Sequence, residues 1–155
     1  MTETIANYLS VLPLNVISID RIEADDTIAY ISKQVLPESQ CFIMSSDKDF
    51  LQLVDKRIAV WSPTKKKLYF KGDVLADTGI PAHNFLLYRS LTGDKSDNIP
   101  GIKGAGLKTL QKRLPILFED RPVTIKEIVE FADESDLKVL QQISNNKDQI
   151  ELNHR

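Results

Sequence analysis

The chain has 155 residues, 42% of them hydrophobic and 27% charged, with a formal net charge of −2. These are ordinary globular values, and the length suits one domain, or one domain with a small appendage. The lone cysteine, Cys41, lies in an apolar run, which favours a buried thiol in a reducing compartment over a disulfide or a nucleophile. There is no signal-like start and no apolar run long enough to cross a bilayer, so we expect a cytoplasmic protein with no membrane partner.

Charge is segregated along the chain. Residues 1–55 carry three basic and nine acidic side chains, a net charge of −6. Residues 56–113 carry twelve basic and four acidic side chains, a net charge of +8, and residues 114–155 carry five and nine, a net charge of −4. An acidic first third beside a basic middle suits a metal site next to a phosphate-binding surface. Taken alone, solvated faces that happen to cluster would explain the pattern equally well.

The first part of the chain alternates helix and strand patterns. Residues 4–12 have apolar side chains at helical spacing, and residues 15–19 are typical of a short strand. A helix with acids in its first turn is predicted over residues 23–35. An apolar strand with both faces covered is predicted over residues 41–45, and a short helix over residues 47–54. This order predicts an α/β layer built on a parallel sheet.

The remainder is expected to be mainly helical. Two strands are predicted over residues 58–62 and 68–70, joined by a turn that contains three lysines, residues 65–67. Those lysines suit either phosphate contacts or a solubility role. We divide the chain into an α/β part, residues 1–80, and a helical part, residues 81–155. Helical segments are predicted over residues 73–78, 81–91, 107–114, 123–133, 135–143 and 146–155.

Acidic residues gather where the predicted strands end and again before a glycine-rich segment. The carboxyl ends of parallel strands meet at one edge of a sheet, where ligands bind, so these side chains are expected to converge. Crowded carboxylates repel one another, and hard divalent cations relieve the repulsion because they prefer oxygen ligands. Two such ions about 3.5–4 Å apart form the clamp used in phosphodiester hydrolysis. The candidate ligands are Glu23, Asp25, Asp26, Asp47, Asp49, Asp94 and Asp97.

Some of these acidic residues also have a purely structural explanation. Asp25 and Asp26 could complement a helix dipole, and Asp47 is a good N-cap residue. For Asp94 and Asp97, three residues apart, a helical turn would place both carboxylates on one side, which supports a shared ligand site. Three groups at matching positions, followed by a glycine hairpin, favour the metal site over these separate explanations.

The glycine-rich segment of residues 101–106 is predicted to form a tight hairpin before a helix. Its glycines allow backbone amides to point outward, and the following helix start adds partial positive charge. Such a corner can hold a phosphate without reading a base. An ordinary corner between two helices is the alternative.

Three segments resemble motifs of the 5′-nuclease (flap endonuclease) family, in the order the family has them. They are IEADDTIA at residues 22–29, SSDKDFLQL at residues 45–53 and GDKSDNIPGIKGAGLKT at residues 93–109. The likeness covers most of residues 15–114 and is strongest to the phage branch, which includes the ribonuclease H of T-even phages. It implies part of a PIN-like α/β fold followed by a helix-hairpin-helix region.

By this resemblance, the seven acidic residues would hold two Mg²⁺ or Mn²⁺ ions that activate water and stabilise the scissile phosphate. The hairpin would grip the duplex backbone behind the cut, often with K⁺ bound by its carbonyls. Basic side chains on the following helix, with Arg113 among them, would add phosphate contacts. The expected DNA-binding residues are Gly101, Ile102, Lys103, Gly104, Ala105, Gly106, Lys108, Thr109 and Lys112.

The chain also departs from the family pattern. Full-length members begin with a strand carrying an aspartate, followed by a second aspartate and a helical arch. Only 22 residues precede Glu23, and neither Glu3 nor Asp20 has the expected context. We therefore expect the carboxy-terminal part of a nuclease, lacking the first strand of the sheet and leaving an apolar edge exposed.

Two functions are compatible with these observations. The first is part of a metal-dependent 5′-3′ exonuclease or flap endonuclease that acts on DNA duplexes with a 5′ flap or an RNA primer in replication or repair. It would become active when a second polypeptide supplies the missing part. The second is a non-catalytic, sequence-independent DNA-binding module with a vestigial acidic site. The chain could also be a stable piece of a longer enzyme.

Overall fold

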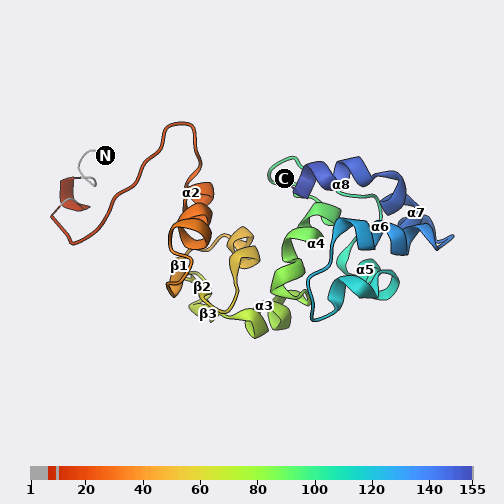
Figure 1. Ribbon diagram of the computed structural model, residues 1–155, viewed down its shortest axis with the longest axis horizontal. Helices are drawn as coiled ribbons and strands as arrows, with labels where there is room; N and C mark the ends of the chain where they lie inside the picture. Colours follow the sequence, from red (N-terminus) through yellow and green to blue (C-terminus); the bar gives the residue numbers. More distant parts are fainter. Residues whose placement is uncertain (1–6, 10, 155) are drawn as a thin grey trace. The chain divides into compact units, whose positions relative to one another are not determined.

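The computed structural model describes residues 7–9 and 11–154 (Figure 1). The chain separates into two compact units, Met1–Pro37 and Glu38–Arg155, which are described in turn. The predicted division into an α/β part, residues 1–80, and a helical part, residues 81–155, stays a prediction.

The first unit is built around one helix. Helix α2 (Ala24–Tyr30) continues into the π-helical turn η1 (Ile31–Val35), as predicted. Of the predicted opening helix, residues 7–9 are helical and residues 11–12 are not, while residues 4–6 and 10 lie outside the described residues. The predicted strand over residues 15–19 is wrong. An apolar pattern indicates a covered face, but a strand also needs a neighbour for its backbone N–H and C=O groups, and the described residues provide none here.

The second unit contains a three-stranded sheet in the order β1-β2-β3. Strand β1 (Cys41–Met44) pairs parallel with β2 (Ile58–Ser62), and β2 pairs antiparallel with β3 (Lys67–Tyr69). The prediction of a parallel sheet is therefore right for the first two strands, and the tight turn before β3 makes the whole sheet mixed, because a short hairpin can join only antiparallel strands.

Strand β1 is an edge strand with one covered face. Ile43 is buried, whereas the side chains of Phe42 and Met44 are 60% and 74% exposed. The prediction that both faces are covered is therefore wrong, because Phe42 and Met44 point to the same face of the strand and both are exposed. Among the described residues, β1 has a strand neighbour on one side only, and the expected loss of a first strand beside it stays a prediction.

Short helices connect the sheet to the helical part. The 3₁₀ helix η2 (Lys48–Leu53) follows β1, and helix α3 (Lys71–Thr78) follows β3 and ends at Gly79. Gly79 adopts a left-handed conformation with φ of 72°, which is typical of a helix C-cap. Helix η3 (Ala82–Asn84) then leads directly into α4 (Phe85–Thr92).

The helical part is packed around one apolar core. Its helices are α5 (Leu107–Arg113), η4 (Pro115–Phe118), α6 (Ile125–Asp133), α7 (Lys138–Asn145) and α8 (Lys147–His154). Helix α4 packs against α8, and α6 against α7 (Figure 1). Leu91, Leu110 and Ile150 are fully buried in this core. None of the helices in the described part of the chain is long and apolar enough to cross a bilayer.

A buried amide fixes the start of α4 to the segment before α6. The Asn84 side chain donates from Nδ2 to the carbonyls of Leu117 and Arg121, both at 3.0 Å. Its Oδ1 accepts from the Val123 N–H at 3.0 Å. Because buried polar groups are costly unless they are paired, this residue holds α4 firmly in place. Helix α4 carries the loop that supplies two of the predicted acidic ligands.

Candidate metal centre

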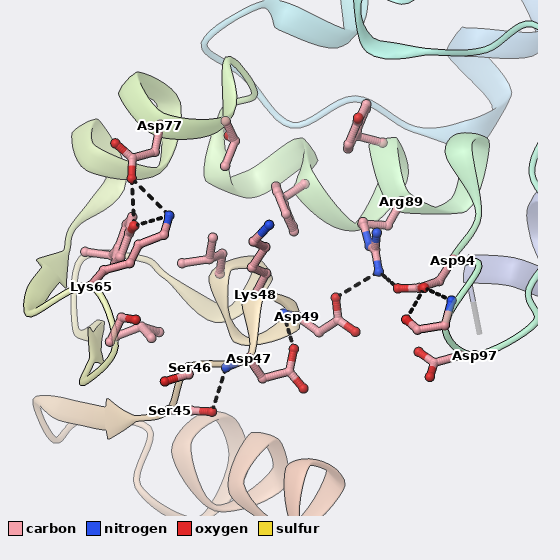
Figure 2. Close-up of a pocket in the computed structure, with 18 residues that line it drawn as sticks. Ser45, Ser46, Asp47, Lys48, Asp49, Lys65, Asp77, Arg89, Asp94 and Asp97 are labelled. Atoms are coloured by element: carbon pink, nitrogen blue, oxygen red, sulfur yellow. Dashed lines mark hydrogen bonds and ion pairs between the residues drawn. The ribbon is translucent and has the colours of Figure 1, made fainter.

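An open pocket with a cavity volume of about 620 Å³ lies within the second unit (Figure 2). Residues from the end of β1, from the β2–β3 hairpin, from α3 and from the end of α4 line it. Four acidic side chains gather toward one end, and Lys65 and Asp77 lie toward the other (Figure 2). The acidic lining residues at the first end are Asp47, Asp49, Asp94 and Asp97.

Asp47 and Asp49 are positioned by the turn that follows β1. The Asp47 Oδ1 accepts from the Asp49 N–H at 2.9 Å, which makes Asp47 the N-cap of η2. The Ser45 Oγ accepts from the Asp47 N–H at 3.1 Å. Asp47 therefore has the capping role that the sequence suggested as an alternative, and it lines the pocket as well.

Asp94 and Asp97 lie in a closed loop and not in the predicted helical turn. Gly93 ends α4 with φ of 70° and turns the chain away from the helix. Asp94 and Ile99 then exchange two backbone hydrogen bonds, of 2.9 and 2.7 Å. The Asp94 Oδ1 accepts from the Ser96 N–H at 2.7 Å and from the Ser96 hydroxyl. These side-chain bonds compete with a helical turn and close the loop.

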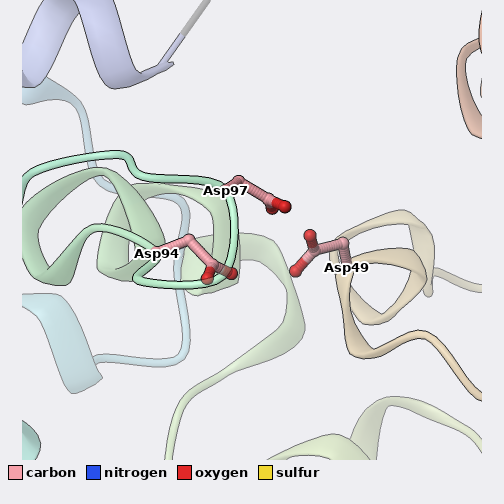
Figure 3. Close-up of side chains that lie close together, drawn as sticks. All are labelled: Asp49, Asp94 and Asp97. Carbon is pink, nitrogen blue, oxygen red and sulfur yellow. The ribbon is translucent and has the colours of Figure 1, made fainter.

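The structure brings together three carboxylates from two separate segments. Single oxygens of Asp49, Asp94 and Asp97 all lie within 4.8 Å of one another. Asp49 projects from η2 toward the two aspartates of the loop (Figure 3). Oxygens at this spacing form a donor set that suits a hard divalent cation. Their assignment as metal ligands stays a prediction.

Arg89, which the sequence analysis did not identify, lies between these acids. Its Nη2 forms an ion pair with the Asp49 Oδ1 at 3.2 Å and a second one with the Asp94 Oδ2 (Figure 2). The residue stands in the last turn of α4, where the helix dipole favours a cation. A basic residue at a helix end, just before an acidic loop, is the signal that could have pointed to it.

The other three predicted ligands lie in the first unit. Glu23 is the N-cap of α2, and Asp25 and Asp26 are in its first turn. All three are exposed, and the Asp25 Oδ1 accepts from the Asp26 N–H at 3.1 Å. This placement suits the helix dipole. Their role as ligands likewise stays a prediction.

Lys65, at the other end of the pocket, and the nearby Lys67 are held in a hydrogen-bonded network. The Tyr69 hydroxyl donates to the Asp77 Oδ2 at 2.6 Å, and Lys67 Nζ donates to the Asp77 Oδ1 at 2.8 Å. Lys65 Nζ donates to the Tyr69 hydroxyl at 2.9 Å. The hydrogen bond from Lys67, followed by that from Tyr69, lowers the pKa of Asp77 to about 2. Lys65 and Lys67 therefore have partners within the protein.

The glycine-rich segment forms a turn that is anchored in the helical core. The side chains of Ile102 and Ala105 are buried, and the Ile102 N–H donates to the Leu91 carbonyl at 2.8 Å. Gly104 has φ of 88°, a conformation that favours glycine. The side chains of Ile102 and Ala105 anchor the turn in the helical core. The other predicted DNA-binding residues lie at its surface. Gly101, Lys103, Gly104, Gly106, Lys108 and Lys112 are exposed, and Thr109 is half-buried.

Sequence comparison finds similar proteins among bacterial exonucleases and polymerases. A 5′-3′ exonuclease of Aquifex aeolicus is 35% identical over 106 residues, which are 68% of this chain and 37% of that protein. The DNA polymerase I of Caldicellulosiruptor bescii is 31% identical over 147 residues, which are 90% of this chain and 17% of that protein. The chain thus spans well under half the length of these relatives.

Structural comparison finds the same fold in a bacteriophage enzyme. The flap endonuclease of bacteriophage T5, solved as a pseudo-enzyme-product complex with DNA and metal ions, superposes with a TM-score of 0.78 and 20% identity. The match covers 99% of this chain and 55% of that one. This shared fold, a small sheet followed by a helical region, confirms the predicted fold class.

The family described as "5′-3′ exonuclease, N-terminal resolvase-like domain" matches residues 1–79. The match covers half of the chain and includes two of the three segments in which the resemblance was found. The chain belongs to the 5′-3′ exonuclease family.

Proposed function

We propose that this chain is part of a divalent-metal-dependent 5′-nuclease that cuts nucleic-acid duplexes with a 5′ flap or a primer, in replication or repair. The observation that carries the proposal is the convergence of Asp49, Asp94 and Asp97 in one open pocket. Membership of the exonuclease family supports it, as does the description of the T5 enzyme with DNA and metal ions.

The donor set fits Mg²⁺ or Mn²⁺. Asp49, Asp94 and Asp97 offer hard oxygen atoms, and the pocket is wide enough for these ions together with water and a phosphate. Asp47 adds a carboxylate to the same lining. Glu23, Asp25 and Asp26 would complete a site for two ions. When bound, such ions supply an activated water and stabilise negative charge at the scissile phosphate.

Hydrogen bonds within the chain hold the candidate metal ligands in position. Ser96 fixes one oxygen of Asp94, and the Asp47 cap fixes the backbone of Asp49. The carboxylates are thus oriented before any substrate arrives, which lowers the cost of reaching the reactive geometry. The open side of the pocket leaves room for a phosphodiester backbone.

The glycine-rich turn is proposed to grip the duplex. Its exposed backbone, with Lys103, Lys108 and Lys112, presents positive charge without a surface that could read bases. A K⁺ ion held by carbonyls of the turn belongs to the same proposal. Binding through such contacts should weaken steeply with added salt, because the counterions of the duplex are released on binding.

The active form is proposed to include a second polypeptide that carries the rest of the catalytic site. Apolar side chains are uncovered in both units, among them Phe42 and Met44 on β1. In the first unit, Ile17, Ile19 and Tyr30 line an apolar groove of about 850 Å³. Exposed apolar surfaces of this extent usually mark protein interaction sites.

The test is cleavage of a 5′-flapped duplex in MgCl₂ by the chain with its candidate partner, the product of the neighbouring reading frame. Asp97→Asn should lower the rate by roughly 100-fold or more, the usual scale for a group that stabilises transition-state charge. Asp97 is exposed, so the variant should fold. Glu134→Gln, an exposed acid outside the pocket, is the matched control and should keep the wild-type rate.

Other outcomes would change the proposal in definite ways. Cleavage by the chain alone would remove the need for a partner. Equal rates for Asp97→Asn and the wild type would overturn the metal assignment. Salt-sensitive duplex binding without cleavage under any condition would replace the nuclease by the non-catalytic DNA-binding module.

A further inference from the structure

We propose that Arg89 is a positioning residue of the candidate metal centre, a built-in counter-charge that holds Asp49 and Asp94 together until a divalent cation displaces it. The inference rests on the proposed function, because it concerns the same carboxylates. It adds Arg89, whose proposed role in metal binding is argued from its contacts with these two carboxylates.

The geometry places one nitrogen of Arg89 on both acids. Its Nη2 contacts the Asp49 Oδ1 at 3.2 Å and also contacts the Asp94 Oδ2. The two acids come from η2 and from the loop after α4, which are far apart in the sequence. A single side chain therefore links the segments that form the site (Figure 2).

The charges of the cluster explain why a cation is needed at this point. Asp49, Asp94 and Asp97 carry three negative charges within 4.8 Å, and such crowding is unfavourable without a counter-charge. The guanidinium is always protonated, so Arg89 supplies this charge at any ordinary pH. Asp94 needs it most, because its side chain is only 16% exposed.

A metal ion would compete with Arg89 at Asp94, because both need an oxygen of that carboxylate. The Asp94 Oδ1 is already engaged by Ser96, so the Oδ2 that contacts Arg89 is the oxygen left for a metal. The Arg89 side chain is 31% exposed, so its charged end can move into water without being buried unpaired. The cation then takes over the role of counter-charge.

We expect Asp97 to be the carboxylate that a metal ion contacts first. It is exposed, and no hydrogen bond or ion pair of its side chain is found in the part of the chain that the structure describes. An ion held there would lie close to the oxygens of Asp49 and Asp94. Displacement of Arg89 would follow from that position.

The test measures metal binding and thermal stability of the full chain, without any activity assay. Arg89→Gln should lower the Tm in metal-free buffer, because Asp49 and Asp94 lose their counter-charge. The same variant should bind Mn²⁺, followed by calorimetry, roughly fivefold more tightly than the wild type, the scale of one partly exposed ion pair. The rise in Tm on saturation with Mn²⁺ should be correspondingly larger.

Arg121→Gln is the matched control. Arg121 also joins two carboxylates, Glu119 at 2.8 Å and Glu127 at 2.6 Å, but it does not line the pocket. This variant should lower the metal-free Tm and leave the Mn²⁺ affinity at the wild-type value.

The results separate this inference from the function on which it rests. If the wild type binds Mn²⁺ and Arg89→Gln binds it equally well or more weakly, the displacement of Arg89 is wrong while the metal centre stands. If the wild type binds no Mn²⁺, both the metal centre in this chain and the inference fail.

Discussion

At the scale of single residues, two glycines determine how the acidic loop meets the glycine-rich turn. A Cβ atom on Gly101 would lie 2.0 Å from the Thr92 carbonyl oxygen. A Cβ atom on Gly93 would lie 2.4 Å from both the Gly101 nitrogen and the Ile99 oxygen. The backbones on either side of the loop are therefore in direct contact. Gly101 is needed for this packing, whatever it contributes to phosphate binding.

Gly101→Ala should accordingly destabilise the protein by roughly 1–3 kcal/mol or more, the scale of overpacking against atoms that cannot yield. Gly72→Ala is the control, because a Cβ atom there meets nothing within 4 Å. On a helix, that change should be neutral or stabilise by about 0.5–1 kcal/mol. Urea denaturation followed by circular dichroism measures both. Equal urea midpoints of unfolding for Gly101→Ala and Gly72→Ala would contradict the close packing seen at Gly101.

At the scale of elements, α6 begins with a reciprocal pair of hydrogen bonds. The Thr124 Oγ1 accepts from the Glu127 N–H at 3.2 Å, and the Glu127 Oε2 accepts from the Thr124 N–H at 2.8 Å. The Glu127 Oε1 also accepts from Arg121 at 2.6 Å. This capping box sets the first residue of the helix at Ile125, two residues later than the sequence pattern suggested.

The capping box of Thr124 and Glu127 also makes the stability of the folded protein depend on pH. Hydrogen bonds from Thr124, first from its backbone N–H, and then the contact with Arg121 lower the pKa of Glu127 from 4.5 to about 2. A lowered pKa in the folded state means that the ionised form stabilises the fold above the unfolded value, and that this gain is lost as the pH falls from 4.5 toward 2.

Glu127→Gln should therefore be less stable than the wild type at neutral pH, and the difference should shrink as the pH falls through this range. Thermal melts across the acidic range measure it. A difference that stays constant with pH would contradict the ionised capping box.

Helix α8 shows how an element distant in the sequence supports the site. The Asn153 side chain donates to the Ser90 carbonyl at 3.0 Å and to the Pro100 carbonyl at 2.9 Å. These carbonyls stand on either side of the loop that carries Asp94 and Asp97. The last helix thus fastens both ends of the acidic loop, although its own sequence gives no sign of a role at the site.

At the scale of the whole molecule, burial is distributed unevenly between the two units. Every residue of 11–26 is exposed, and α2 contains no buried residue. The second unit has a core of fully buried side chains, among them Leu114, Leu117 and Ile128. Local stability follows such differences, because a segment with few buried contacts opens at little cost.

Hydrogen–deuterium exchange should therefore be fast over residues 11–26 and slow over α6 and α7. Addition of the proposed partner polypeptide should slow exchange in the first unit and at β1, because their apolar side chains would become covered. Mass spectrometry of peptic fragments measures this directly. Strong protection of residues 11–26 in the isolated chain would contradict the burial described above.

Much of this molecule could be predicted from local sequence patterns. Most of the helices, the β2–β3 hairpin and the end of α3 at Gly79 agree with the prediction, because periodicity, turn residues and capping act over a few residues, whereas η4 is not predicted. The acidic groups were identified for the same reason. The prediction failed for residues 15–19, which lack a strand to pair with in the described part of the chain, and for the exposed face of β1, because pairing and coverage depend on elements far away in the sequence.

By itself, the sequence determined most of the helical and extended segments, where the carboxylates stand along the chain and which family the motifs resemble, because these properties are encoded within short stretches. Only the tertiary structure decided that Asp49 meets Asp94 and Asp97, and that Arg89 lies between them. Those contacts join segments far apart in the chain. Their distances are set by the packing of α4 against η2 and α8, which no local pattern contains.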